Sequence, residues 1–314
     1  MNSQQPLTLS TSETYVAVVT GANKGIGFEI CKQLAAKGIT VVVTARDVER
    51  GAQAIEKLKA SAISEHLLLF HQLDLCNQSS VDSLVDFIKH KFGKLDILMN
   101  NAGVSGVMAD QESYRELLNG HMAEMSNSVL KEDLDKAKES ETDTYEWAEQ
   151  CMETNYYGTK RVTEAFIPLL LLSDAPRIVN VSSPMGMLKY LSNEWAIGVL
   201  SNVDELTEDK VDEVINAYLK DRKDGSYIVK GWPAYFSAYK LSKAVLNAYT
   251  RIMAKKYPKI LINAVDPGFV KTDLTFNLGF ITPEEGGESP VNLALLPKGG
   301  PSGLFFERNE VGSF

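Results

Sequence analysis

Cysteine and histidine are both scarce in this chain of 314 residues, which contains three cysteines and four histidines. The cysteines, Cys31, Cys76 and Cys151, are scattered and show no C-x-x-C spacing, so we expect free thiols in a reducing compartment. The histidines have no metal-ligand spacing, and we therefore expect no catalytic metal. They are His66, His71, His90 and His121.

Long hydrophobic runs and an excess of positive charge are lacking as well. The longest aliphatic run, residues 169–172, is far too short to span a bilayer. Residues 1–14 are polar and lack the apolar core of a signal peptide, so we expect a flexible N-terminal segment and a cytoplasmic protein without a membrane role. The net charge is −9 and no basic stripe offsets it, which argues against a nucleic-acid partner.

What the chain does have is a regular alternation of apolar strands and amphipathic helices. Continuous apolar strands are typical of a parallel sheet that is covered on both faces. We therefore expect one Rossmann-type, doubly wound α/β domain over residues 15–314, with ligands at the carboxyl ends of the strands. The expected strands are residues 16–20, 40–44, 67–72, 97–100, 178–181 and 260–265, and the clearest helices are 26–37, 48–60 and 79–91, the last capped by Ser79 or Ser80.

Two stretches, at about residues 105–150 and 189–235, interrupt this alternation. The first is acidic and mostly polar, with weak helical signals at 132–139. The second contains an expected helix at 207–220, which starts with the capping sequence T-E-D-K-V. Surface decoration is one interpretation. We favour helical insertions that form walls of the substrate pocket or a lid over it, because long loops at the ligand edge of such folds usually carry function.

A glycine-rich turn, T-G-A-N-K-G-I-G, lies between the first strand and the first helix. Gly21 permits the tight turn, Gly25 lets the backbone approach a pyrophosphate, and Gly27 lets helix and strand pack closely. The amino terminus of the helix then offers unpaired N–H groups to negative charge. This context predicts a dinucleotide site, with contacts from Gly21, Asn23, Lys24, Gly25, Ile26 and Gly27.

Charged residues near this turn indicate which dinucleotide is bound. Arg46 follows the second strand, where NAD-selective sites place an acidic residue, and Lys24 lies in the loop across from it. A guanidinium suits a 2′-phosphate, so the pair favours NADPH/NADP⁺, although each could be a solvated cation. Asp74, which Leu75 follows, either accepts a bond from the adenine amine or stands beside a helix cap. Asn101, Ala102 and Gly103 end the fourth strand, where small residues would let a flat ring approach.

Tyr239 and Lys243 are four residues apart, so on a helix they project from one face. A nearby ammonium favours phenolate, and we expect Lys243 to lower the pKa of Tyr239. A phenol tuned in this way could exchange a proton at neutral pH. The spacing is common by chance, so the pair gains its meaning from the other motifs.

The motifs together resemble the short-chain dehydrogenase/reductase superfamily over nearly the whole chain. In order, they are T-G-A-N-K-G-I-G, N-N-A-G, N-Y-Y-G, the serine pair after I-V-N-V, Y-x-x-x-K and D-P-G. Stretches such as F-G-K-L-D-I-L, S-N-E-W-A and L-P-K-G-G-P-S-G are similar to the plant branch that contains salutaridine reductase and the menthone reductases.

The resemblance implies a role for each motif residue. Tyr239 would be the general acid, Lys243 would bind the nicotinamide ribose, and Ser183 rather than Ser182 would orient the carbonyl. The backbone of Asn155 would hold a water that links Lys243 to solvent. The segment expected near the nicotinamide carboxamide contains Pro267, Gly268, Val270 and Thr272, and the substrate contacts expected are Val104, Ser105, Ser183, Met185, Phe236, Tyr239 and residues from Phe269 to Leu274.

Three features differ from the common pattern of the superfamily. Compact members place the serine shortly before the tyrosine, whereas an insertion separates Ser183 from Tyr239 here; in the plant branch it covers the helix faces used for association, so we expect a monomer. Asp266 stands where relatives often have cysteine, and it either tunes substrate preference or faces solvent. A member of the branch that reduces a C=C bond has an acidic residue in place of the tyrosine, so the retained Tyr239 favours carbonyl reduction.

The leading hypothesis is reversible, NADPH-dependent reduction of a ketone to a secondary alcohol on a plant terpenoid- or alkaloid-like substrate. The alternatives are an enone C=C reductase, a broad-specificity carbonyl detoxification enzyme and, less in keeping with the intact motif set, a non-catalytic NADPH-binding regulator. The sequence does not name the substrate or the stereochemistry of the product.

Overall fold

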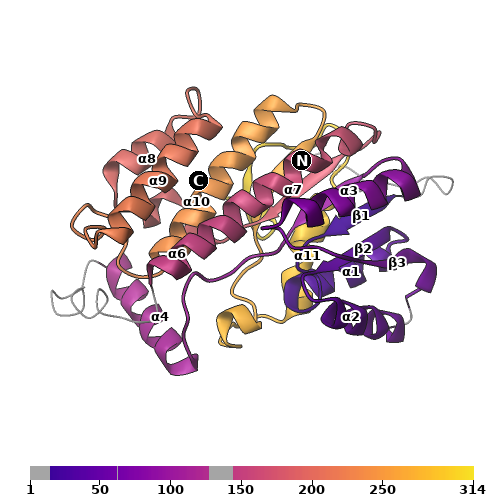
Figure 1. Ribbon diagram of the computed structural model, residues 1–314, viewed down its shortest axis with the longest axis horizontal. Helices are drawn as coiled ribbons and strands as arrows, with labels where there is room; N and C mark the ends of the chain where they lie inside the picture. Colours follow the sequence, from indigo (N-terminus) through magenta and orange to yellow (C-terminus); the bar gives the residue numbers. More distant parts are fainter. Residues whose placement is uncertain (1–14, 62, 127–143) are drawn as a thin grey trace.

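The structure, a computed structural model, describes residues 15–61, 63–126 and 144–314. Its centre is an eight-stranded sheet of order β3-β2-β1-β4-β5-β6-β7-β8 (Figure 1). All neighbouring strands are parallel except β7 and β8, which form an antiparallel edge. The strands are β1 (Val16–Val19), β2 (Thr40–Ala45), β3 (Leu68–Gln72), β4 (Ile97–Asn100), β5 (Arg177–Val181), β6 (Leu261–Asp266), β7 (Phe305–Glu307) and β8 (Glu310–Val311). The strand order reverses between β1 and β4, which is where ligands of such folds bind.

Two layers of helices cover the sheet, and the strands supply apolar side chains to both. In β1, Val16 and Val18 belong to one buried cluster and Ala17 and Val19 to the other, because successive side chains point to opposite faces. This confirms the doubly wound fold that the apolar strands predicted. The first layer contains α3 (Gln78–Phe92), α6 (Tyr145–Met152), α7 (Thr159–Leu170) and α10 (Ser237–Lys256), and the second contains α1 (Gly25–Ala36), α2 (Val48–Ala60) and α11 (Pro283–Ala294).

Helix caps agree with the sequence at one helix and correct it at another. Thr207 caps α9 (Glu208–Lys223) by accepting from Lys210 N at 3.3 Å, as the T-E-D-K-V start predicted. The expected cap of α3 by Ser79 or Ser80 is wrong. Asn77, which precedes both serines, caps that helix, because its Oδ1 accepts from Ser79 N at 3.0 Å.

Both insertions contain helices. The first holds α4 (Gln111–Met125) and α6, while the helical signal at 132–139 lies outside the described residues. The second holds α8 (Glu194–Ser201) and α9, which lie beside α10 and away from β1–β3 (Figure 1). Within the described ranges no helix is both long and apolar enough to cross a membrane.

Candidate active site

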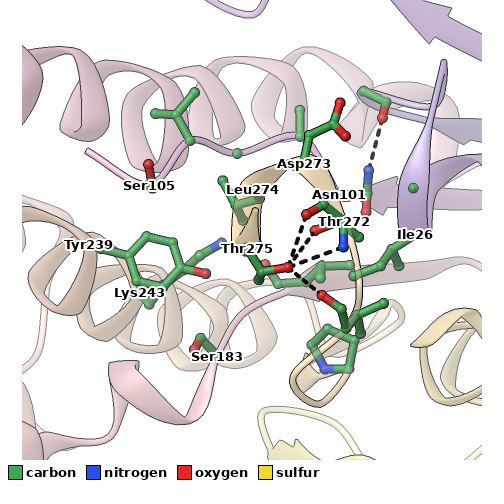
Figure 2. A pocket seen from close by; sticks show the side chains of 18 of the residues that line it. Ile26, Asn101, Ser105, Ser183, Tyr239, Lys243, Thr272, Asp273, Leu274 and Thr275 are labelled. Carbon is green, nitrogen blue, oxygen red and sulfur yellow. Dashed lines mark hydrogen bonds between the residues drawn. The ribbon is translucent and has the colours of Figure 1, made fainter. Parts of the chain in front are cut away.

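A cavity of about 840 Å³ opens at the carboxyl ends of the strands, between the glycine-rich turn and α10. Its walls include every residue that the sequence predicted to contact cofactor or substrate; Asn155, which lies behind the wall, is the one predicted site residue outside this set. Figure 2 shows Tyr239, Lys243 and Ser183 at one end, with Ile26, Asn101 and Thr272 toward the other.

The glycine-rich turn forms a cradle of bare backbone. Gly21 and Gly25 have φ values of 62° and 59°, a conformation that favours glycine. A Cβ on Gly27 would lie 2.4 Å from Asn101 Nδ2, which donates to Thr20 O at 2.9 Å and Gly21 O at 3.1 Å. The turn is thus pinned to the end of β4, with the start of α1 facing the cavity. The geometry suits a pyrophosphate at the helix amino terminus.

The rim of this cradle carries the charges that the sequence singled out. Arg46 follows β2 and is exposed at the cavity wall. Lys24 is also exposed, but its Nζ pairs with Asp273 Oδ2 at 2.5 Å across the cavity mouth. Asp74 lines the cavity while its Oδ1 accepts from Cys76 N at 3.0 Å, so it takes part in the turn before α3 and still faces the cradle.

Lys243 is buried beside Tyr239 on α10. Its Nζ lies 5.6 Å from the centroid of the Tyr239 ring and donates to Val181 O at 2.9 Å. Burial lowers the pKa of Lys243 from its ordinary value to about 8. The ammonium is therefore charged at neutral pH, because its pKa is still above that pH.

The pKa of Tyr239 corrects an expectation. Burial raises it well above the ordinary value of a phenol; nearby Tyr114 raises it further, whereas the hydroxyl of Ser183 acts in the opposite direction. The expected lowering by Lys243 is not found, because loss of hydration dominates for both groups. Tyr239 thus holds its proton at neutral pH, which is the form that a proton donor needs.

The two serines that follow β5 have different surroundings. Ser182 is buried and its Oγ donates to Asn247 Oδ1 at 2.7 Å. Ser183 lines the cavity, and its Oγ accepts from Met185 N at 3.2 Å. Because that bond leaves the hydroxyl proton free to point into the cavity, Ser183 is the serine placed to contact a carbonyl.

Asn155 lies in a π-helical turn, Glu153–Gly158, between α6 and α7. Its side chain binds both backbone groups of Val104, accepting from N at 2.8 Å and donating to O at 2.9 Å. A Cβ on Gly103 would lie 3.2 Å from Asn155 Oδ1 and 3.6 Å from Lys243 Nζ, so Asn155 lies directly behind two residues of the cavity wall. π-turns occur frequently at functional sites. Here the side chain of Asn155 is occupied by hydrogen bonds within the protein.

The segment after β6 closes the cavity opposite α10. Thr275 Oγ1 donates to Val270 O at 2.6 Å and accepts from Thr272 N at 3.1 Å, as drawn in Figure 2. Asp266 is 7% exposed, which excludes the interpretation that it faces solvent, and its Oδ1 accepts from Gly268 N at 2.9 Å. Burial raises the pKa of Asp266 to about 6.

Comparison with known proteins agrees with this geometry. The family model for short chain dehydrogenases matches residues 15–195. The chain is 54% identical to a (+)-neomenthol dehydrogenase of Capsicum annuum, over 97% of this chain and 99% of the relative.

The chain belongs to the short-chain dehydrogenase/reductase family.

A (−)-isopiperitenone reductase of Mentha piperita is 52% identical over 94% of this chain and 96% of the relative. The structure of salutaridine reductase from Papaver somniferum matches with a TM-score of 0.82 and 50% identity, covering 93% of this chain and 99% of that one. These matches place this oxidoreductase in the plant branch of the family that the motifs indicated, and its fold is the Rossmann-type fold of the family.

Sequence reasoning missed the cavity residues that α4 supplies, which are Tyr114, Leu118, His121 and Met122. Their spacing is that of one helical face, and this was the available signal. From the second insertion only Tyr190 and Phe236, at or just beyond its ends, line the described cavity. Helices α8 and α9 supply no residue to the described cavity, because their apolar faces pack on α6 and α10 instead. That the second insertion forms a lid stays a prediction.

No group of three or more histidine, cysteine or acidic side chains within the described ranges could hold a metal ion. Cys31, Cys76 and Cys151 form no disulfide.

Proposed function

We propose that this enzyme reduces a ketone to a secondary alcohol, reversibly, with NADPH as the hydride source and a plant terpenoid- or alkaloid-like molecule as the substrate. The observation that carries the proposal is the convergence of Tyr239, Ser183 and Lys243 at one end of a single cavity. The other end of that cavity is a cradle of bare glycine backbone. The relatives named for neomenthol, salutaridine and isopiperitenone support the substrate class.

The residues of the chain divide the chemistry among them. When bound, the nicotinamide cofactor supplies the hydride. Tyr239 donates the proton that the carbonyl oxygen needs, and Ser183 donates a second hydrogen bond that orients this oxygen. Two fixed donors aimed at the oxygen stabilise negative charge where it develops. Lys243 holds the ribose hydroxyls and keeps a positive charge beside the phenol.

The choice of NADPH rests on Arg46, which follows β2 at the cavity rim. A guanidinium can bind a 2′-phosphate through paired N–H donors, and an acidic residue in its place would repel that group. Arg46→Asp should therefore lower kcat/KM for NADPH and shift the preference toward NADH by about tenfold or more, equivalent to ~1.4 kcal/mol. Steady-state kinetics with both cofactors test this, and an unchanged preference would refute the assignment.

We favour ketone reduction over C=C reduction as the activity because Tyr239 is present and holds its proton. The test is NADPH consumption with a panel of saturated cyclic ketones and the corresponding enones, with products identified by mass spectrometry. We expect alcohols from the saturated ketones. Saturated ketone products formed from enones, with no alcohol from any substrate, would favour the C=C reductase. Tight NADPH binding without turnover would favour a regulator.

Two further properties belong to the proposal. The chain acts as a monomer, because the second insertion covers helix faces beside α10. It works in the cytoplasm without nucleic-acid or membrane partners, and its three free thiols suit a reducing compartment.

A further inference from the structure

The first insertion places one polar ring in the cavity wall that the proposed reaction does not use. His121 lies on α4 and lines the cavity, and it is 6% exposed. Its Nδ1 is buried and has no hydrogen-bond partner. Buried polar atoms in folded proteins are nearly always paired, so an unpaired one beside a cavity needs an explanation.

Aromatic residues surround this imidazole. Its ring centroid lies 5.9 Å from that of Tyr190 and 6.4 Å from that of Phe236, and both contacts are edge-to-face. Met122 and Leu118 line the cavity beside it. The ring is thus a hydrogen-bonding group in an apolar wall.

The imidazole is neutral at physiological pH. Burial, and then the positive charge of Lys240, lower the pKa of His121 to about 4. Glu124, one turn further along α4, pairs with Lys240 and balances its charge. A neutral imidazole offers one donor and one acceptor, so it suits an uncharged oxygen group better than an ion.

The position of His121 is fixed by an anchor one turn further along α4. Glu124 accepts from Ala234 N at 2.8 Å and from the buried ammonium of Lys240 on α10. These bonds tie α4 to the start of the helix that carries Tyr239. His121 is therefore held in a set place relative to the catalytic end of the cavity, as a recognition group must be.

We propose that His121 is a specificity-determining residue whose imidazole hydrogen-bonds a second oxygen group of the substrate. The inference rests on the proposed ketone reduction and narrows its substrate class. Because Tyr239 and Ser183 take the reacting carbonyl, His121 is left for another part of the same molecule. The preferred substrates are cyclic ketones that carry a hydroxyl, ether or second carbonyl away from the reacting carbon.

The test compares matched ketones that differ only in this second oxygen. The probes are 2-decalone, its analogues hydroxylated on the distal ring, and further monocyclic and polycyclic pairs built in the same way. KM and kcat are measured separately from NADPH oxidation for the wild type, His121→Phe and His121→Asn. The matched control is His66→Phe, which makes the same change at an exposed site outside the cavity.

We expect the wild type to have the lower KM for the hydroxylated member of at least one pair. His121→Phe should raise that KM about tenfold or more, which corresponds to ~1.4 kcal/mol. The KM for the unsubstituted ketone should stay within about twofold, and kcat should change little. His121→Asn retains a donor and an acceptor and should recover part of the affinity.

A second readout separates recognition from structure. In the wild type, the ¹⁵N shifts of the His121 ring should move when the hydroxylated ketone binds and stay in place with 2-decalone. Because this readout uses the wild type, it tests the inference even if His121→Phe does not fold. The inference would be overturned if His121→Phe raised KM equally for both members of each pair. It would also be overturned if the ¹⁵N shifts of the ring did not distinguish the two members. If the wild type reduces no ketone at all, it is the proposed function that fails.

Discussion

At the scale of single residues, the protonation state of Tyr239 determines whether it can act as the acid in carbonyl reduction. Its raised pKa keeps the phenol protonated at neutral pH, so it is ready to donate to a carbonyl oxygen. Tyr239→Phe removes only the hydroxyl and should lower kcat by about 100-fold or more, the usual contribution of a positioned acid. The affinity for NADPH, measured through the fluorescence of the bound cofactor, should change by less than about twofold. A variant with wild-type turnover would show that another group is the acid.

Lys243 determines how the reduction depends on pH. Burial lowers its pKa to about 8, so the side chain is charged below that pH and loses its proton above it. Tyr239 does not titrate in this range because its own pKa is raised further. We expect kcat for reduction to be level around pH 7 and to fall by up to about tenfold per unit above 8. A pH–rate profile measured at saturating NADPH checks this, and a rate that stays level to pH 10 would contradict it.

At the scale of elements, one hydroxyl links two parts of the segment between β6 and α11. Thr275 Oγ1 binds the backbone of both Val270 and Thr272, the residues expected to contact the nicotinamide end of the cofactor. Thr275→Val keeps the shape but removes these bonds. We expect the free energy of unfolding to fall by about 1–3 kcal/mol and the KM for NADPH to rise, measured by denaturant titration and steady-state kinetics. A loss of stability with an unchanged KM would show that the segment does not contact the cofactor.

The sequence predicted those elements in which the local backbone geometry restricts the choice or the spacing of residues. The glycine-rich turn requires positive φ at Gly21 and Gly25, and the Tyr239–Lys243 spacing requires a helix, so both were readable. The pKa of Tyr239 was not readable, because it depends on burial, which sequence spacing does not report.

α11 shows why other elements were missed. Its sequence, P-E-E-G-G-E-S-P, has poor helix propensity. Thr282 and Glu285 nevertheless form a capping box at its start. A Cβ on Gly286 would lie 2.6 Å from Val270 Cγ2, and one on Gly287 would lie 2.8 Å from Gln33 Nε2. The glycines that weaken the helix locally are what let it pack closely on the segment after β6 and on α1, so tertiary contact overrides propensity. The cavity wall of α4 was missed for a similar reason, because its residues become a site only once the helix is placed.

At the scale of the whole molecule, the second insertion covers faces of α6 and α10. The apolar face of α9 is fully buried against the main core, and the hydroxyls of Tyr218 and Ser237 form a 2.7 Å hydrogen bond at the start of α10. Glu208 joins all three helices, accepting from Lys160 of α7 at 2.9 Å and from Lys256 of α10 at 3.0 Å. A surface already occupied by the chain's own helices is not available to a second copy.

The chain should therefore be monomeric, with a mass near 34.6 kDa in sedimentation equilibrium. The physical reason is specific, since α8 and α9 cover the helix faces through which the resemblance to compact members of the superfamily leads us to expect association. A concentration series in the micromolar range should show no increase in mass. Glu208→Gln offers an internal check, because it weakens the ionic link of α9 to α7 and α10 without removing any apolar side chain. We expect that variant to lose about 1–2 kcal/mol of unfolding free energy and to stay monomeric. A dimeric or tetrameric wild type would mean that some other face carries the association, and the argument from the covered helices would fail.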